Sequence, residues 1–303
     1  MTAPLISVVI ATLNRRHLVT EAIRSVLAQT QPVEEIIVID DGSTDGTGET
    51  LTRVFGSHIR YVWQDNAGVS AARNNGLAMA GGRFLTLLDS DDRWHPDKTR
   101  LQKAWLDDHP GYGMVVCDVA RVTQDGHPID TLHRRNAIPE DGEVLRWVLR
   151  DPTLVPASVM FRREVFESTG GFDTKLSTGE DLEFHLRVAR DWKIGVIELV
   201  LATAMRGHDG LSASASTYSD YVLALERFIP TVEDRLPAEQ LASAVSLAYR
   251  RSARGLILEA RWKEALQFVK RAWSRAPSLG ERLQVLRLAP IAARRLGSAW
   301  RRR

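Results

Sequence analysis

Short apolar runs alternate with stretches of helical periodicity along the first third of the chain. The apolar runs are rich in β-branched residues and predict strands within residues 5–14, 33–47, 59–66 and 83–89. Between them, residues 15–30 and 68–80 repeat apolar side chains at helical spacing and predict helices. Strands that alternate with helices indicate an open, mostly parallel α/β sheet, whose ligands sit beyond the carboxyl ends of the strands.

The pattern becomes mixed after residue 97 and entirely helical near the end. We expect a helix over 97–110, a strand and hairpin over 113–130, a helix over 177–192 and a strand pair over 193–209. From Tyr218 onward only helical periodicity remains, with two helices predicted in 237–277 and one more in 279–303. The sequence therefore predicts an α/β body followed by a helical extension that begins near residue 218.

Polar side chains gather where three of the predicted strands end. They are Thr12 and Asn14, Asp40 and Asp41, and Asp89 and Asp91. Like charges this close repel one another, so the acidic ends favour a bound divalent cation. The alternative is a solvated turn, and we expect Asp92 to cap the helix that follows.

Composition limits the class of protein. The 303 residues are 44% hydrophobic and 26% charged, as in ordinary globular proteins, and the single Cys117 excludes an internal disulfide and is expected in the core. We read no signal peptide at the N-terminus and no apolar run of the roughly 20 residues that span a bilayer. These features predict a cytoplasmic protein.

The net charge of +2 conceals two opposite halves. Residues 250–303 contain 15 Lys/Arg and 3 Asp/Glu, whereas the rest of the chain contains 25 and 35. A basic helical tail with arginines beside Leu, Ile and Trp predicts either a solvated surface or docking on the anionic cytoplasmic face of a membrane, which truncation before Leu279 should abolish. No nucleic-acid-binding motif accompanies the charge, so we expect no nucleic-acid partner.

Five motifs occur in the order and at the spacing of the family 2 glycosyltransferases. They are SVVIATLNR, VIDDGSTDGT, NAGVSAARNNGL, LLDSDDRWHPDKTRLQ and STGEDLEFHLRV. Over residues 5–210 the chain resembles these inverting, nucleotide-sugar-dependent enzymes, and the resemblance implies their GT-A fold. It divides the expected domain 1–217 into a nucleotide-sugar half, about 1–110, and an acceptor half, about 111–217, before the extension 218–303.

The resemblance also implies a donor site. Residues that correspond to family positions for the nucleotide are Ala11, Thr12, Asp40, Asp41, Asn66, Gly68, Arg73 and Asp89. Many relatives carry Pro-Thr-Tyr-Asn where this chain has Ala11-Thr12-Leu13-Asn14, so an aromatic surface for the base is absent here. A UDP-sugar is the expected donor, and a glycan or lipid-linked molecule the expected acceptor.

The metal and the catalytic base follow from the same resemblance. The Asp-Ser-Asp element would place Asp91, with Asp89, on Mn²⁺ or Mg²⁺, and His208 lies where some relatives place a further metal or pyrophosphate contact. Asp181 would remove the acceptor proton as general base. Two other classes remain open: an inactive transferase-like scaffold that acts through its helical tail, and a nucleotidyltransferase, whose expected triphosphate loop is missing.

Overall fold

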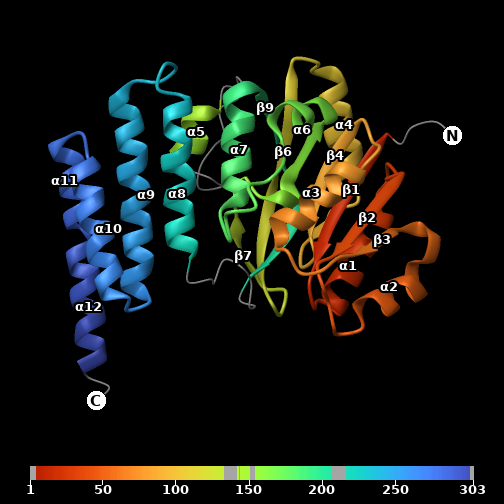
Figure 1. Ribbon diagram of the computed structural model, residues 1–303, viewed down its shortest axis with the longest axis horizontal. Helices are drawn as coiled ribbons and strands as arrows, with labels where there is room; N and C mark the ends of the chain where they lie inside the picture. Colours follow the sequence, from red (N-terminus) through yellow and green to blue (C-terminus); the bar gives the residue numbers. More distant parts are fainter. Residues whose placement is uncertain (1–4, 133–141, 143, 151–153, 207–215, 301–303) are drawn as a thin grey trace. The chain divides into compact units, whose positions relative to one another are not determined.

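The computed structural model describes residues 5–132, 142, 144–150, 154–206 and 216–300, with side chains as far as residue 295. The chain divides into two compact units (Figure 1). The first contains residues 1–175 and 180–210, and the second contains residues 176–179 and 211–303.

A nine-stranded sheet organises the first unit, in the order β3-β2-β1-β4-β8-β6-β9-β5, with β7 paired to β6 (Figure 1). Its strands are β1 (Ile6–Thr12), β2 (Glu35–Asp40), β3 (Arg60–Trp63), β4 (Phe84–Asp89), β5 (Arg93–Trp94), β6 (Tyr112–Thr123), β7 (Pro128–Thr131), β8 (Val159–Arg162) and β9 (Lys193–Arg206). The neighbours β3, β2, β1 and β4 run parallel to one another. β8 is antiparallel to both β4 and β6, and β9 is parallel to β6.

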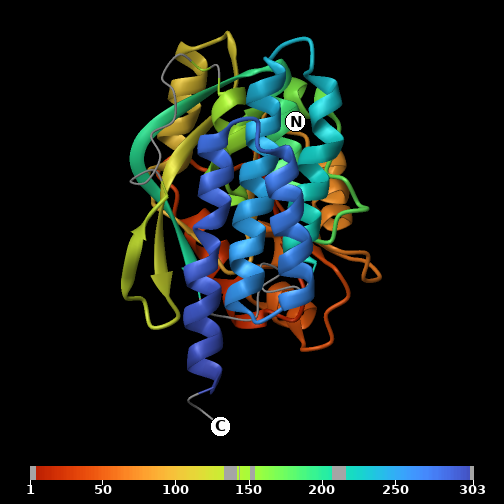
Figure 2. The same ribbon diagram turned by 90° about the vertical axis from the view of Figure 1, so that its left-hand side faces the viewer.

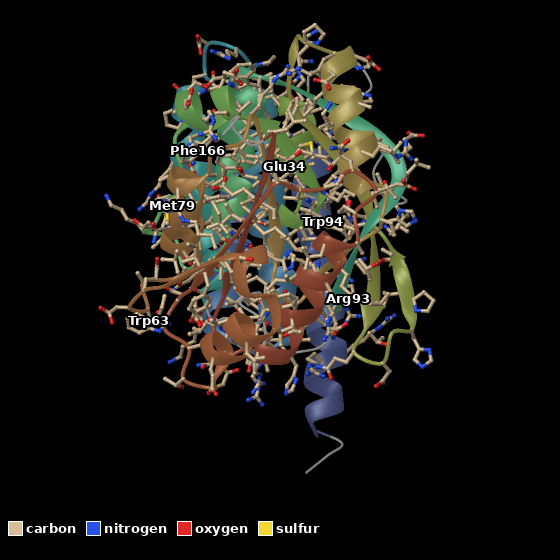
Figure 3. All side chains as sticks on the ribbon, turned by 90° about the vertical axis from the view of Figure 1, so that its right-hand side faces the viewer. Glu34, Trp63, Met79, Arg93, Trp94 and Phe166 are labelled. Carbon is tan, nitrogen blue, oxygen red and sulfur yellow. The ribbon has the colours of Figure 1, made fainter. Side chains whose placement is uncertain are left out.

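The parallel half brings the predicted strand ends together. Thr12 pairs with Asp40, and Ala11 pairs with Asp89, so the three acidic or polar ends lie at one edge of the sheet. The exposed Trp63 ends the edge strand β3 and pairs with Asp40 (Figure 3). The expected parallel α/β sheet, with polar strand ends gathered at one edge, is therefore present in this half.

The predicted strand pair in 193–209 is wrong, because β9 is a single strand of 14 residues. Its sequence offers no turn residues that could reverse the chain between Val196 and Arg206. Instead the register against β6 shifts near Asp118, opposite exposed residues of β9. An irregularity of this kind bends a strand without ending it.

Helices pack around the sheet of the first unit. They are α1 (Arg16–Leu27), α2 (Thr47–Phe55), α3 (Val69–Met79), α4 (Lys98–Asp108), α5 (Leu145–Arg150), α6 (Arg163–Thr169) and α7 (Glu180–Asp191), with short 3₁₀ turns at Gly56–His58 and Pro156–Ser158. Val8 and Ile10 belong to the core that α1 and α2 complete, whereas Val9 faces α3. There Gly76 permits the close approach, since a Cβ on it would lie 2.3 Å from Val9 Cγ1.

Buried polar residues support the sheet beside α4. Lys98 Nζ donates to Gln102 Oε1 at 2.7 Å and lies 4.2 Å from the ring centre of the buried Trp94 (Figure 3). Burial lowers the pKa of Lys98 to about 8. Cys117 is fully buried, as expected, and burial raises its pKa to about 11.

The second unit is helical. It contains α8 (Thr217–Phe228), a 3₁₀ turn at Ile229–Thr231, α9 (Ala238–Leu258), α10 (Trp262–Arg275), α11 (Leu279–Leu286) and α12 (Leu288–Trp300) (Figure 2). Ala253, Ile257 and Ala265 form its core together with Leu288. In the part of the chain that the structure describes, no helix is long and apolar enough to cross a membrane.

The single helix predicted for 279–303 is in fact two. Ser278 caps α11, its hydroxyl accepting the N–H of Glu281, and the chain restarts as α12 at Leu288. Pro290 explains the break, because it lacks an N–H and cannot continue α11, but it fits the first turn of a new helix.

Candidate active site

The end of β1 is joined to the turn after β2. Asn14 has a left-handed φ of +52°, a conformation that asparagine tolerates well. Its N–H donates to Ser43 Oγ at 2.8 Å, and its Oδ1 accepts the N–H of Thr44 at 2.8 Å. These bonds fix the loop that follows Thr12 beside the loop that follows Asp40.

Asp41 anchors the loop before α3. Its Oδ1 accepts from Gln64 Nε2 at 2.7 Å and from the N–H of Ala67 at 2.9 Å, and its Oδ2 accepts from the N–H of Gly68 at 2.8 Å. Gly68 has a φ of +88°, a conformation that favours glycine, and no atom lies within 4 Å of a Cβ built on it. Asn66 is exposed in the same loop.

Asp40 is also engaged within the protein. It accepts the N–H of Ser43 and the hydroxyl of Tyr61, both at 2.8 Å, and burial together with Asp40 raises the pKa of Tyr61. A carboxylate offers about four acceptor positions, so neither Asp40 nor Asp41 is saturated by these contacts. Contact of either residue with a nucleotide base stays a prediction.

Two buried hydroxyls near this edge have no hydrogen-bond partner among the described residues. They are Thr12 Oγ1, at the end of β1, and Ser70 Oγ, in the first turn of α3. Thr12 is connected to the α3 N-terminus through Asp41, whose N–H donates to Thr12 O at 2.9 Å. Because a buried hydroxyl without a partner is costly, these groups suit a polar ligand at this edge.

Arg73 lies at the centre of the candidate site. Its Nη2 donates to Asp89 Oδ1 and its Nη1 to Glu180 Oε1, both at 2.6 Å. Burial alone would lower the pKa of this guanidinium, but Asp89 and Glu180 raise it above its ordinary value. Arg73 thus joins the end of β4 to the start of α7. Its expected contact with the nucleotide stays a prediction.

Asp181 lies beside this ion pair, in the first turn of α7. Burial, together with the charge of Glu180, raises the pKa of Asp181 to about 7, although the charge of Arg73 opposes this rise. One turn later, burial with Arg73 and Arg187 lowers the pKa of His185 to about 3, so this histidine is neutral at physiological pH. A carboxyl group that titrates near pH 7 is suited to general base catalysis.

The other acidic side chains after β4 have different surroundings. Asp91 Oδ2 accepts from Arg15 Nη1 at 2.7 Å. Asp92 is buried, and burial, Asp89 and Asp91 raise its pKa well above the usual value, while Arg206 opposes them. The expectation that Asp92 caps the next helix is wrong, because α4 begins at Lys98 after Asp97.

A divalent cation fits this donor set in its chemistry. Asp89 and Asp91 supply hard oxygen atoms. Their negative charges add to the effect of burial in raising the pKa of Asp92. No group of three or more His, Cys, Asp or Glu that could hold a metal occurs within the described ranges. Metal binding by Asp89 and Asp91 stays a prediction. His208, the third predicted contact, lies outside the described residues.

Sequence reasoning missed the role of two residues. Glu180 was not assigned a contact, and Arg15 was not considered, yet they pair with Arg73 and Asp91. Arg73 and Glu180 are 107 positions apart, and no local pattern relates residues at that separation. The adjacent acids Glu180 and Asp181 were the one available signal.

Relatives of known sequence cover the body of the chain. A Rickettsia felis protein described as an uncharacterized glycosyltransferase is 30% identical over 217 residues, which are 71% of this chain and 34% of that protein. A putative teichuronic acid biosynthesis glycosyltransferase, TuaG of Bacillus subtilis, is 32% identical over 171 residues, or 53% of this chain and 63% of TuaG. The chain therefore spans between one third and two thirds of the length of these relatives.

Solved structures share the fold at low sequence identity. Residues 1–349 of S. aureus TarS in complex with UDP-GlcNAc align with a TM-score of 0.72 and 19% identity, over 96% of this chain and 89% of TarS 1–349. The mannosyltransferase PcManGT of Pyrobaculum calidifontis, in complex with GDP-Man and Mn²⁺, aligns with a TM-score of 0.60 and 20% identity, over 100% and 89% of the two chains. These similarities establish the expected GT-A fold.

The sequence profile described as Glycosyl transferase family 2 matches residues 7–170, which contain the strand-end aspartates and Arg73. This match covers more than half of the chain and agrees with the family that the five motifs indicate. The chain belongs to glycosyl transferase family 2.

Proposed function

We propose that this protein transfers a sugar from a nucleotide-diphosphate sugar to a hydroxyl group of a glycan or lipid-linked acceptor, with inversion at the anomeric carbon. The observation that carries the proposal is the Asp89–Arg73–Glu180 bridge. It connects the acidic end of β4 to the helix turn that contains Asp181, through two contacts of 2.6 Å. The nucleotide-sugar donor and a general base with a pKa of about 7, Asp181, would thus share one site.

On the donor side, the ends of β1 and β2 and the start of α3 would hold the nucleotide. The free hydroxyls of Thr12 and Ser70, and the backbone around Gly68, offer polar groups to its base, ribose or phosphates. TarS and PcManGT have been crystallised with UDP-GlcNAc and GDP-Man, which supports a nucleotide-sugar donor. We propose a UDP-sugar for this chain.

Asp89 and Asp91 would hold Mn²⁺ or Mg²⁺, with remaining ligands from the donor diphosphate and water. Bound there, the ion would neutralise negative charge that develops on the leaving diphosphate. The Mn²⁺ in the PcManGT complex supports this choice. To accept the ion, Asp89 and Asp91 must loosen their contacts with Arg73 and Arg15.

Asp181 would accept the proton of the acceptor hydroxyl as that oxygen attacks the anomeric carbon. A hydroxyl group is a weak nucleophile near neutral pH, and a positioned base contributes about 10²–10⁴-fold to the rate. Attack from the side opposite the diphosphate inverts the anomeric centre. Glu180, held by Arg73, would keep the first turn of α7 in place for this transfer.

Two relatives are named for polysaccharide synthesis: TuaG for teichuronic acid biosynthesis and ExoO of Rhizobium meliloti for succinoglycan biosynthesis. These names support an acceptor in cell-surface polysaccharide synthesis. An acceptor of this kind is often carried on a lipid, and we propose that the enzyme works at the cytoplasmic surface of a membrane. The basic tail of 15 Lys/Arg and 3 Asp/Glu supports that placement.

The test measures release of nucleoside diphosphate from a panel of UDP- and GDP-sugars, with Mn²⁺, Mg²⁺ or a chelator. We expect release with one donor, and a loss of about 10²–10⁴-fold in Asp181→Asn with donor binding retained in a thermal-shift assay. Asp191→Asn, at the other end of α7, is the matched control and should behave as wild type. Near-wild-type turnover of Asp181→Asn would exclude that base, and absence of binding or turnover with every donor would favour the scaffold class.

A further inference from the structure

The second unit carries an exposed surface in which apolar and cationic side chains alternate. We call it the α10–α11 face: it consists of Lys263, Leu266, Lys270 and Trp273 on α10, and Leu279, Arg282, Leu283 and Leu286 on α11. Along α10 the members are three, four and three positions apart, the spacing of one helix face. The leucines Leu279, Leu283 and Leu286 repeat in the same way along α11.

These apolar side chains are accessible. Leu266 is 56% exposed, Leu279 is 71% exposed and Leu283 is 53% exposed. The helical core is made by other residues of the same helices, such as Ala265, Ala272 and Val285, which are buried. The exposed side chains of the α10–α11 face are therefore not needed for the packing of the unit. Large apolar side chains that gather at the surface in this way are typical of an interaction site.

The charge of the face has one sign. Lys263, Lys270 and Arg282 are exposed, and the face contains no Asp or Glu. Among the described residues, the nearby acids have other partners: Glu264 binds Arg261 at 2.6 Å, and Glu281 Oε1 accepts from Ser243 Oγ at 2.6 Å. The partner of this face must therefore be anionic as well as able to receive leucine side chains.

The two helices present the face together. The Arg282 guanidinium lies 5.9 Å from the ring centre of Trp273, so a cation of α11 is close to the indole of α10. Figure 2 shows α10 alongside its neighbours in the second unit. Truncation before Leu279 would therefore remove α11 and leave the α10 half of the face, so point variants are the sharper test.

We propose that the α10–α11 face docks on an anionic lipid bilayer, with its leucines and Trp273 inserted at the level of the headgroups and its cations on the lipid phosphates. Interfacial helices combine cations with Leu and Trp in this way, and long Lys and Arg side chains can extend past the apolar layer to reach headgroups. A nucleic acid would match the charge but would leave the leucines in water. The proposal deepens the membrane placement that forms part of the proposed function.

The experiment is sedimentation of the full chain with vesicles of phosphatidylcholine, alone or with added phosphatidylglycerol. We expect pelleting only with the anionic vesicles, and weaker pelleting as salt is raised. The double variant Lys263→Glu/Lys270→Glu should weaken binding at least about tenfold, because each cation near the surface contributes. The matched control Arg53→Glu/Lys175→Glu changes the same charge at exposed positions of the first unit and should bind as wild type.

A second pair of double variants tests the leucines of the α10–α11 face. Leu266→Ser/Leu283→Ser should reduce binding to the same vesicles, whereas Val54→Ser/Leu199→Ser, at similarly exposed positions, should not. Absence of pelleting by the wild type, or equal pelleting of the face and control variants, would overturn the proposal. Donor turnover measured without vesicles distinguishes failure of membrane docking from failure of the proposed transferase function. The variants of the α10–α11 face should keep donor turnover, whereas Asp181→Asn should lose turnover and still pellet with the vesicles.

Discussion

Replacing Arg73 with methionine should destabilise the first unit strongly. The guanidinium is 6% exposed and holds Glu180, which is 9% exposed, and Asp89, which is 31% exposed. Removing one partner of a buried ion pair costs about 3–5 kcal/mol, because the other charge stays buried and unpaired. Glu180 should account for most of this loss, since solvent screens the more exposed Asp89.

A double variant distinguishes this cause from a general packing defect. Arg73→Met/Glu180→Gln removes the buried negative charge together with its partner, so it should be more stable than Arg73→Met alone by about 1–3 kcal/mol. The measurement is urea unfolding followed by circular dichroism. Arg24→Met is the control: its partner Glu21 is 43% exposed, and we expect a change of about 0.5 kcal/mol or less.

The single variant Arg73→Met should also change the pH dependence of activity. Arg73 opposes the rise in the pKa of Asp181, so without Arg73 this pKa should move above its value of about 7. A general base acts in its deprotonated form; the acidic limb of the kcat/KM profile should therefore shift to higher pH, with activity recovering as pH rises. An unchanged limb, or a double variant no more stable than Arg73→Met, would refute the reasoning.

Three further predictions concern single residues. Burial holds the pKa of Asp181 near 7, above the ordinary 3.8, so its ionisation destabilises the folded state as pH rises from about 4 through 7. Asp181→Asn should therefore be inactive but more stable than wild type when chemical unfolding is measured at pH 8. The pKa of Lys98 is lowered from 10.5 to about 8, so the unfolded chain binds the proton more tightly than the folded chain. The stability of the wild type should therefore rise between pH 8 and 10.5. Unfolding curves recorded across this window should show no such rise for Lys98→Met. Gly76→Ala should cost about 1–3 kcal/mol through the contact with Val9, while Gly111→Ala, where no atom lies within 4 Å, should leave the melting temperature nearly unchanged.

The sequence predicts this fold best where structure is local. Each parallel strand is a short β-branched run, and the aspartates that end β2 and β4 could be placed at one edge by the geometry of parallel sheets alone. The prediction of two strands in 193–209 failed because a long strand with an irregular register looks, in one dimension, like two strands. The break between α11 and α12 was missed although Pro290 marks it.

The candidate site was less predictable, because its contacts are distant in sequence. Periodicity places Arg73 on a helix and Glu180 at a helix start, but it does not bring them to 2.6 Å. The burial of Asp92 was equally unpredictable. Its neighbours in sequence suggest a capping turn, whereas the folded chain encloses it. The raised pKa values of Arg73 and Asp92 therefore follow from tertiary structure.

The arginines change what the acidic cluster itself implies. Mutual repulsion among Asp89, Asp91 and Asp92 calls for nearby positive charge, and the folded protein supplies it with Arg73 on Asp89 and Arg15 on Asp91. Repulsion alone therefore argues only for a cation and does not choose between a guanidinium and a metal. The chemistry of the leaving group favours a metal. A departing diphosphate carries charge that these two arginines, already engaged with carboxylates, are poorly placed to neutralise as well. An ion that binds both the aspartates and the diphosphate would release the guanidinium groups from Asp89 and Asp91, and Arg73 would remain held to α7 through Glu180.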